Sequence, residues 1–229
     1  PGHVVSGRSA AVLHGLPVFR LPHLPETTCL TPAVLGSRTG RHVYGAKTRQ
    51  DEMSSWFGAP VHTVPRTIVD LARHDRRDGL MAADLALRDG LVTRMQVDAQ
   101  LRSAAGWPGV RGARQVLLLA SPLAESPLES LARLAVHDFG LPMPEWQVGL
   151  WDPFERRLYR VDMMWRDQKV ILEADGREKY SNDALWQEKL RELALTRLGY
   201  RVERVVWTDL TTGWQQTRAR LRALLSLPR

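Results

Sequence analysis

Three acidic residues stand close together where two short apolar segments follow one another in the sequence. In residues 169–175, alternation of side chains along a strand would place Glu173 and Asp175 on the same face. Asp162 stands among apolar residues of the preceding segment. If the two segments form a hairpin through residues 166–168, a strand spacing of about 4.8 Å brings Asp162 close to Glu173. Crowded carboxylates repel one another unless a cation or proton neutralises them. Oxygen ligands alone favour Mg²⁺ or Mn²⁺ over zinc.

The elements that must position these acids follow a regular order. Ser126-Pro127-Leu128-Glu129 is a capping box with proline at the first helical position, and the helix it begins should end at Gly140. The pattern then predicts strands over 146–151, 158–165 and 169–175, a helix over 182–198, a strand over 200–207 and a last helix from 208 or 209 to about 225. Three consecutive strands, a crossover helix and a fourth strand predict a mixed sheet with helices on its faces.

The first half of the chain has a different pattern. A short helix is expected over residues 9–14, closed by Gly15, and strand-like segments follow at 27–31 and 42–44. From Pro65 onward the apolar spacing becomes helical, with further helices at 80–88, 93–104 and 113–119. We therefore expect a mostly helical α+β N-terminal domain over residues 1–122 and an α/β domain over residues 123–229.

Composition restricts the classes of protein to which the chain can belong. Its 229 residues carry a net charge of +7, which divides into +6 for residues 1–122 and +1 for residues 123–229. A single cysteine, Cys29, excludes an intramolecular disulfide and cysteine-based zinc or iron–sulfur sites. Without a long apolar run or a signal-peptide pattern, we expect a soluble cytoplasmic protein that does not enter membranes. The lack of a Gly-rich phosphate loop and of a Gly-x-Ser-x-Gly motif argues against nucleotide hydrolysis and serine esterase chemistry.

The acidic motifs of the second half resemble the PD-(D/E)XK nuclease superfamily, and more closely its very-short-patch-repair-type endonuclease domains. The matching segments are Ser126-Pro127-Leu128-Glu129, Arg160-Val161-Asp162, Leu172-Glu173-Ala174-Asp175-Gly176, Glu188-Lys189-Leu190-Arg191 and Gly199-Tyr200-Arg201-Val202. The resemblance implies a restriction-endonuclease-like fold, a mixed sheet flanked by helices in the order α-β-β-β-α-β-α. It also implies a metal-dependent DNA endonuclease of repair or defence.

Two earlier segments resemble actinobacterial antitoxin-like proteins of the AbiEi family. These segments are Ser9-Ala10-Ala11-Val12-Leu13-His14-Gly15-Leu16-Pro17 and Arg66-Thr67-Ile68-Val69-Asp70-Leu71-Ala72-Arg73. Such relatives usually carry a winged-helix DNA-binding module before the first segment. We expect that module to be absent from this sequence.

The nuclease resemblance assigns roles to particular residues. Asp162 and Glu173 would bind Mg²⁺ or Mn²⁺, with Glu129 as a supporting ligand. A lysine normally stands two residues after the glutamate, where it orients or activates the attacking water, and here Asp175 occupies that position. Lys179 and Lys189 are the candidates to replace it.

Each of these residues also has a structural interpretation that stays open. Asp162 would form a salt bridge with Arg160, Arg191 or Lys169, and Glu173 and Asp175 would be exposed acids at a strand end. The capping box accounts for Glu129. Lys179 would be a solvated loop charge, and Lys189 part of a solvated helix face. Arg218, Arg220 and Arg222 on the last helix are candidates for DNA phosphate contacts or a solvated helix end.

Two functions of another class stay open beside the endonuclease. The first is a DNA-binding, antitoxin-like regulator whose nuclease fold no longer cleaves, an alternative kept by Asp175 in the lysine position. The second is a protein–protein module of a toxin–antitoxin pair. DNA is the expected partner, and the basic N-terminal half would hold its phosphate backbone. A homodimer, a cognate toxin and a repair partner are further options.

Overall fold

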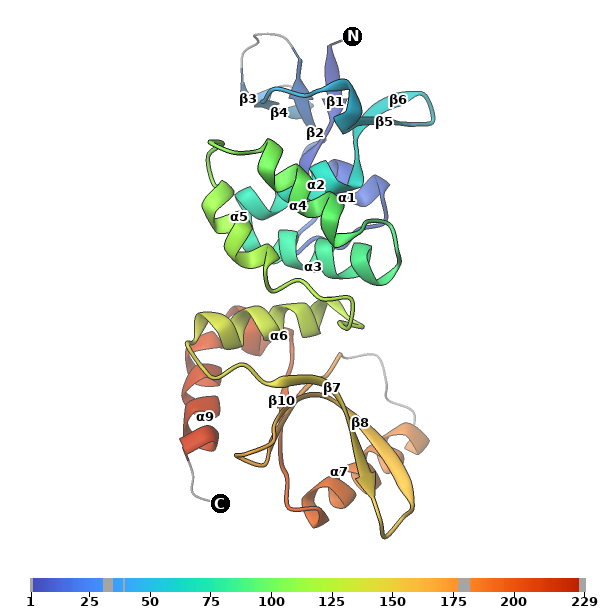
Figure 1. Ribbon diagram of the computed structural model, residues 1–229, viewed down its shortest axis with the longest axis vertical. Coiled ribbons are helices and arrows are strands. Elements are labelled where there is room, and N and C mark those ends of the chain that lie inside the picture. The colour runs from blue at the N-terminus through green and yellow to red at the C-terminus, as the bar shows by residue number, and fades with distance from the viewer. Residues whose placement is uncertain (1, 31–34, 39, 177–181, 227–229) are drawn as a thin grey trace. The chain divides into compact units, whose positions relative to one another are not determined.

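The computed structural model describes residues 2–30, 35–38, 40–176 and 182–226, without the side chains of 38 and 182–185. The chain divides into two compact units, Pro1–Pro127 and Leu128–Arg229 (Figure 1). The division expected after Pro122 falls a few residues earlier, in the loop before the helix that begins at Pro127.

The N-terminal unit contains a six-stranded mixed sheet in the order β3-β4-β2-β1-β6-β5. The strands are β1 (His3–Val5), β2 (Glu26–Cys29), β3 (Gly36–Arg38), β4 (Arg41–Gly45), β5 (Met53–Trp56) and β6 (Ala59–His62). The pairs β1–β6 and β2–β4 are parallel, and β1–β2, β3–β4 and β5–β6 are antiparallel.

Five helices pack together beside this sheet (Figure 1). They are α1 (Gly7–Leu13), α2 (Val64–His74), α3 (Arg76–Arg88), α4 (Arg94–Ser103) and α5 (Val110–Leu117). Buried apolar residues such as Ile68 of α2 and Leu80 of α3 form their shared core. Gly79 allows α2 and α3 to approach closely, because a Cβ atom there would lie 2.3 Å from Ala72.

The sheet of this unit is larger than the sequence predicts. The expected strands at 27–31 and 42–44 correspond to β2 and β4, whereas β1, β3, β5 and β6 were missed, so the expectation of a mostly helical domain was incomplete. The missed strands have three or four residues, too few for a period-of-two pattern to be recognised. Pro60 within β6 also argues against a strand in sequence reasoning.

The C-terminal unit has a four-stranded mixed sheet in the order β10-β9-β8-β7. The strands are β7 (Glu145–Asp152), β8 (Arg157–Trp165), β9 (Val170–Ala174) and β10 (Arg201–Val205). β7, β8 and β9 pair antiparallel, and β10 lies parallel to β9. The helices are α6 (Pro127–Asp138), α7 (Asn182–Arg197), α8 (Trp207–Thr211) and α9 (Trp214–Ser226). The predicted element order is therefore present, except that the last helix is two helices.

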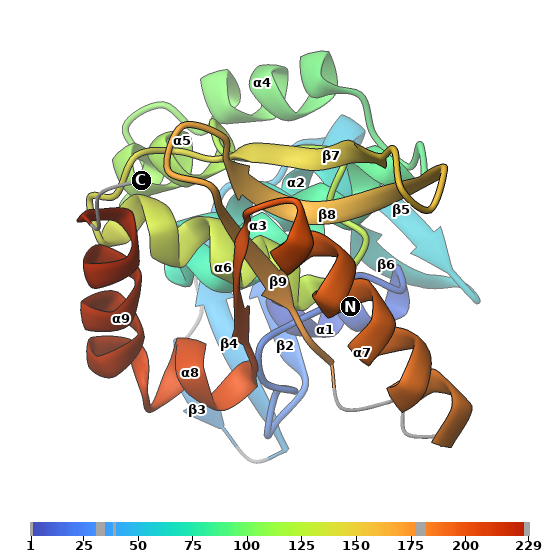
Figure 2. The ribbon, with the colours of Figure 1, turned by 90° about the horizontal axis from the view of Figure 1, so that it is seen from below.

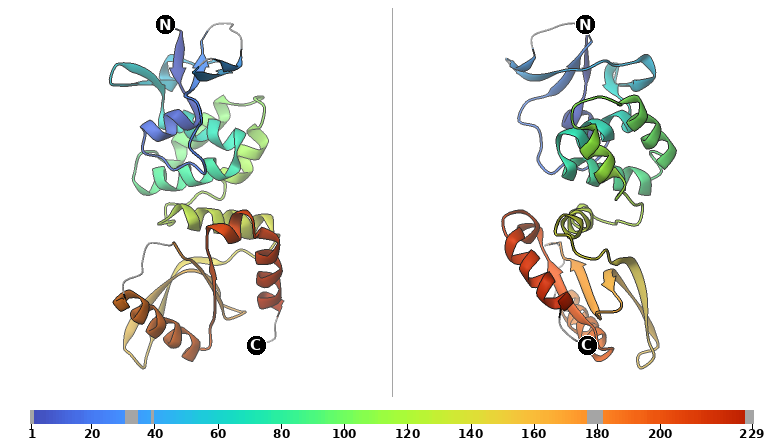
Figure 3. Two further views of the ribbon diagram at one scale, coloured as in Figure 1. Left: turned by 180° about the vertical axis from the view of Figure 1, so that it is seen from behind. Right: turned by 60° about the vertical axis from the view of Figure 1, so that its left-hand side comes forward.

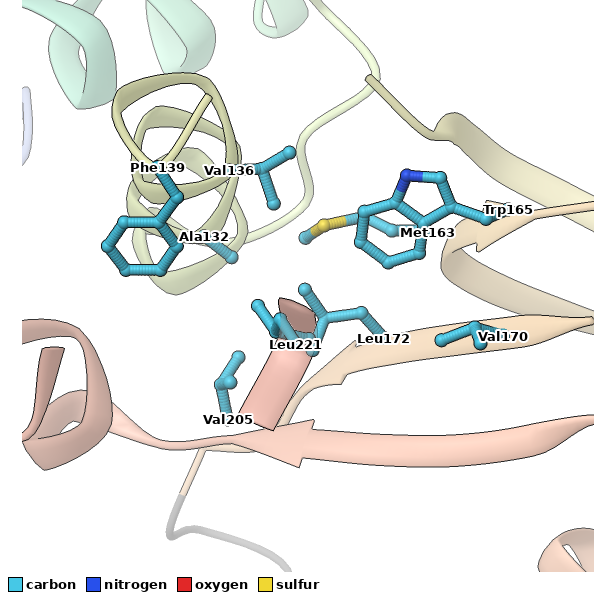
Figure 4. Close-up of a cluster of buried hydrophobic side chains, with 9 residues drawn as sticks. All are labelled: Ala132, Val136, Phe139, Met163, Trp165, Val170, Leu172, Val205 and Leu221. Carbon is cyan, nitrogen blue, oxygen red and sulfur yellow. The ribbon is translucent and has the colours of Figure 1, made fainter. Parts of the chain in front are cut away.

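Two apolar clusters cover the two faces of this sheet. Residues of α6 and α9, including Val136 and Leu221, pack against Met163, Trp165 and Leu172 on one face (Figure 4). Ala194 and Leu195 of α7 pack on the other face, against residues that include Tyr159, Val161, Met164 and Ile171. Figure 2 shows α7 running alongside the sheet. The chain thus belongs to the α/β class, with helices on both faces of its second sheet.

Candidate functional site

Asp162 and Glu173 lie side by side where β8 and β9 stop pairing. The described pairs are Trp165 with Val170, Met164 with Ile171 and Met163 with Leu172. The next position of this register places Asp162 opposite Glu173. At this position the Asp162 side chain binds the backbone of β9: its Oδ2 accepts a hydrogen bond from the Ala174 N–H at 2.9 Å. The two acids therefore come together at the end of the hairpin, as the sequence predicts.

The sheet is irregular at the same point. Val161 packs with the α7 cluster and Met163 with the α6 cluster, although two residues two positions apart on a regular strand share a face. On β7, Gln147 has a positive φ of 49° and lies between the paired residues Trp146 and Val148. In both strands the inward-facing side chains therefore switch from one face of the sheet to the other at the same paired position. Asp162 occupies that position on β8, and Gln147 occupies it on β7.

Glu173 is a buried acid with basic neighbours on two sides. Its side chain is 8% exposed, with Oε1 2.6 Å from Nη2 of Arg191 and Oε2 3.9 Å from Nε of Arg204. Burial raises the pKa of Glu173 to about 7, and the negative charges of Asp162 and Glu188 add to this effect, while Arg191 and Arg204 oppose it. The two arginines therefore offset the cost of burying the charged carboxylate only in part.

The two arginines reach Glu173 from different elements. Arg204 lies directly opposite Glu173 in the parallel pairing of β9 and β10. It also binds two acids of α7, Glu188 at 2.7 Å and Glu192 at 2.9 Å. Arg191 projects from α7 and donates to the backbone carbonyl of Arg160 at 2.6 Å, just before Asp162 on β8. Helix α7 is thus connected to three strands around the acidic pair.

The sequence motifs gave no specific role to these arginines. Arg191 was expected as a salt-bridge partner of Asp162 or as part of a solvated helix face, and in the structure it contacts Glu173. The spacing of Glu188 and Arg191, three residues apart on a helix, indicates that they share a face and was a signal available in the sequence. Arg204 could not be placed without the β9–β10 register.

Glu129 does not form a three-residue metal-binding group with the other predicted metal ligands. It is buried on α6, and its Oε2 accepts a hydrogen bond from Nε2 of Gln147 at 2.9 Å. Within the described residues, no group of three or more His, Cys, Asp or Glu side chains is arranged to bind a metal ion. The expected three-ligand set of Asp162, Glu173 and Glu129 is therefore not assembled, because α6 packs on the face of the sheet opposite α7.

The remaining acids and lysines have different positions. Asp175 is half-buried directly after β9, and its N–H donates to the carbonyl of Val205 at 2.9 Å. Lys189 is exposed on α7, and it projects from a different side of the helix than Glu188 and Arg191. Lys179 lies outside the described residues.

The three arginines of α9 do not form one basic surface. Arg218 and Arg222 are four residues apart and share a side of the helix, with Arg218 half-buried and Arg222 exposed. Arg220 lies on another side and binds Glu203 at 2.8 Å and Asp209 at 3.3 Å. This pairing accounts for Arg220 without a phosphate contact, while the DNA-binding role of the three arginines stays a prediction.

The residues at the acidic pair fit a divalent cation in a limited way. Mg²⁺ is commonly held by one or two carboxylates together with water and substrate phosphate oxygens. Asp162 and Glu173 provide two such carboxylates. The surrounding cluster has an excess of negative charge, because four acids stand against two arginines: Asp162, Glu173, Glu188 and Glu192 against Arg191 and Arg204. The two carboxylates thus suit a cation whose coordination shell is completed by water and a substrate phosphate, and they do not form a closed site made of protein ligands alone.

Comparison with known proteins identifies relatives and no family. The chain is 33% identical over 146 residues to the uncharacterized proteins MT2308 and Rv2248 of two Mycobacterium tuberculosis strains, CDC 1551 / Oshkosh and H37Rv. The match covers 63% of this chain and 54% of each relative, so the chain spans about half the length of the curated relatives it matches. No family model and no solved structure matches. None of the helices in the described part of the chain is long and apolar enough to cross a bilayer.

Proposed function

We propose that the C-terminal unit is a Mg²⁺- or Mn²⁺-dependent DNA endonuclease. The observation that carries this proposal is the buried carboxylate of Glu173 beside Asp162 at the point where β8 and β9 separate. A buried acid with a raised pKa next to a second acid is a typical feature of a catalytic or metal-binding site. The resemblance to PD-(D/E)XK nucleases gives this pair its chemistry. The expected cytoplasmic location belongs to the same proposal.

Each residue has a defined part in the proposed reaction. Asp162 and Glu173 would hold the cation, which when bound supplies Lewis acidity at the scissile phosphate. The hydrogen bond from the Ala174 N–H fixes the orientation of Asp162. Arg191 connects Glu173 to the backbone of β8 and thereby keeps both acids at one level. The basic N-terminal unit would bind the DNA backbone, so affinity should fall steeply with salt.

Cleavage assays with matched variants test the proposal. Plasmid, linear and mismatched DNA are incubated with Mg²⁺ or Mn²⁺ and the wild type, Asp162→Asn or Glu173→Gln. Glu203→Gln is the control, because Glu203 lies on β10 but binds Arg220 of α9. We expect Mn²⁺ binding, measured by calorimetry, and cleavage to be lost in the two site variants and kept in the control. Cleavage that persists in both site variants, or no cleavage by the wild type on any substrate, contradicts the proposal.

A second candidate is a DNA-binding regulator that does not cleave. The specific observation in its favour is the 2.6 Å contact between Arg191 and Glu173, which gives the acid a cationic partner without a metal ion. Asp175 in the position of the usual lysine points the same way. Calorimetry distinguishes the two candidates. The endonuclease binds Mn²⁺, and Glu173→Gln abolishes that binding. The regulator binds DNA in a salt-dependent manner, and Glu173→Gln leaves its Mn²⁺ binding unchanged.

A further inference from the structure

The hairpin of β5 and β6 is an exposed arm of the N-terminal unit. Residues 54–60 are all exposed, and both faces of its outer half therefore contact solvent. Figures 1 and 3 show the hairpin projecting from the sheet. A two-stranded hairpin with so little packing is marginally stable in water. We therefore expect its outer half to pack against another molecule.

The tip of the arm carries two aromatic residues. Phe57 is 93% exposed and Trp56 43% exposed, and their rings meet edge to face with centroids 4.6 Å apart. Phe57 also has a positive φ of 47°, beside Gly58 at 81°. Asparagine is the favoured residue at the first position of such a turn, and a bulky residue there is strained. The tip therefore combines backbone strain with exposed apolar area.

The outer edge of the arm is open to another strand. β5 is the last strand in the order of the six-stranded sheet, and no strand of the described chain pairs with its second edge. Residues 53–61 contain no charged side chain. Natural edge strands usually carry lysine, inward-facing charge or a bulge that prevents pairing between molecules, and β5 has no lysine or other charge.

We propose that β5 of two copies of this chain pair antiparallel, so that the arm is the interface of a homodimer. An antiparallel pair of identical strands is related by a twofold axis, which closes the assembly at two copies. Each copy would place Trp56 and Phe57 against the partner's arm and remove them from water. The absence of charge on the arm favours this occupant over DNA, whose phosphates require basic side chains.

The decisive experiment measures the molar mass of the full chain in solution. Light scattering and sedimentation across a concentration series should give a dimer for the wild type. Phe57→Asn removes the aromatic ring and supplies a residue that adopts positive φ, so the turn itself is kept or improved. Combined with Trp56→Ser, it should weaken the dimer at least about 100-fold, because two aromatic side chains leave the interface. Ser55→Lys places a charge on the edge strand and should also yield monomers.

A matched control separates the arm from general surface hydrophobicity. Leu21 is 71% exposed in the same unit but lies outside the arm, so Leu21→Asn should leave the dimer unchanged. Thermal unfolding of all variants verifies that the fold is retained. A monomeric wild type at 100 micromolar overturns the proposal, as does a dimer that survives both arm variants. Loss of DNA affinity in the arm variants of a monomeric protein would assign the tip to nucleic acid instead. DNA cleavage is scored separately and does not bear on the dimer.

Discussion

Each unit contains a cluster of charged side chains around a buried ionisable group, and the two clusters differ in how fully their charges are paired. In the N-terminal unit, Arg66 is fully buried and binds Asp70 at 2.7 Å and Glu52 at 2.8 Å. Gln100 donates a further hydrogen bond to Glu52 at 2.7 Å. Burial alone would raise the pKa of Asp70, but His62, whose Nδ1 lies 3.3 Å from Oδ2 of Asp70, and the charge of Arg66 outweigh burial and hold this pKa below its usual value.

The cluster around Glu173 has the opposite balance. Its acids outnumber its arginines, and the pKa of Glu173 is raised to about 7 because burial outweighs Arg191 and Arg204. Arg191 and Arg204 are themselves partly exposed, with side chains 27% and 31% accessible. Removing one partner from a paired buried cluster is strongly destabilising, whereas a cluster with excess negative charge is suited to a cationic ligand. The comparison predicts that substitutions should affect stability in the first unit and activity in the second.

The largest expected effect is on catalysis. Glu173→Gln should reduce DNA cleavage at least about 1000-fold, since a metal ion contributes several kcal/mol to the transition state and each 1.36 kcal/mol is tenfold in rate. The free energy of unfolding in the absence of metal should not fall, because the neutral amide avoids burying a charge. The measurements are single-turnover cleavage and urea unfolding. A substantial loss of stability with unchanged cleavage would make the Glu173 cluster structural, like the first.

The second effect is on the stability of the N-terminal unit. Arg66→Met leaves Glu52 and Asp70 buried without their cation and should cost about 3–5 kcal/mol of unfolding free energy. Hydrogen exchange of α2 and α3 measures this loss in the full chain. Arg94→Met is the control, because the Arg94 side chain is 39% exposed and its ion pair with the exposed Asp98 contributes little. Equal effects of the two variants would contradict a special role for the buried network.

A smaller effect is expected from acid. Because the pKa of Asp70 is lower in the folded protein, its ionisation stabilises the fold above the unfolded pKa of about 3.9. That contribution is lost as the pH falls through the lower, folded pKa. Hydrogen exchange of α2 should therefore show decreasing protection below about pH 4. Asp70→Asn should remove this dependence, while Asp51→Asn, at an exposed acid, should preserve it.

The smallest effect concerns Glu129. Its carboxylate accepts from Gln147 and does not join Asp162 and Glu173 in a three-ligand group. Glu129→Gln keeps an oxygen acceptor for that hydrogen bond, so cleavage should fall by less than about tenfold and metal affinity should be unchanged. Calorimetry with Mn²⁺ and cleavage rates measure both quantities. A loss as large as that of Glu173→Gln would return Glu129 to the metal site.

The sequence was most informative where the elements are long and regular. Residue alternation around Glu173 and the capping box before α6 predict the second unit well, since each depends on a local pattern. The N-terminal sheet was only partly predicted, because strands such as β1 pair with segments distant in the sequence and are too short to show a pattern.

The candidate site was predictable to a similar extent. The proximity of Asp162 and Glu173 follows from a hairpin, which is a local structure. The contact of Arg204 with Glu173 depends on the parallel register of β9 and β10, which only the tertiary structure defines. The hydrogen bond between Gln147 and Glu129 likewise depends on which face of the sheet α6 covers.

The exchange of faces at Gln147 and Asp162 has a consequence for how this domain can change over time. Both strands exchange faces at the same level, so the pairing of Trp146 with Met163 and of Val148 with Val161 keeps one register. Inserting or deleting a single residue in either strand would turn its apolar side chains to the wrong face beyond that point. The length of these strands is therefore constrained by the core, whereas under the proposed function the identity of residue 162 is constrained by metal binding. If the proposed function holds, a lineage that lost it would accumulate substitutions at 162 and 173 long before it tolerated a length change in β7 or β8.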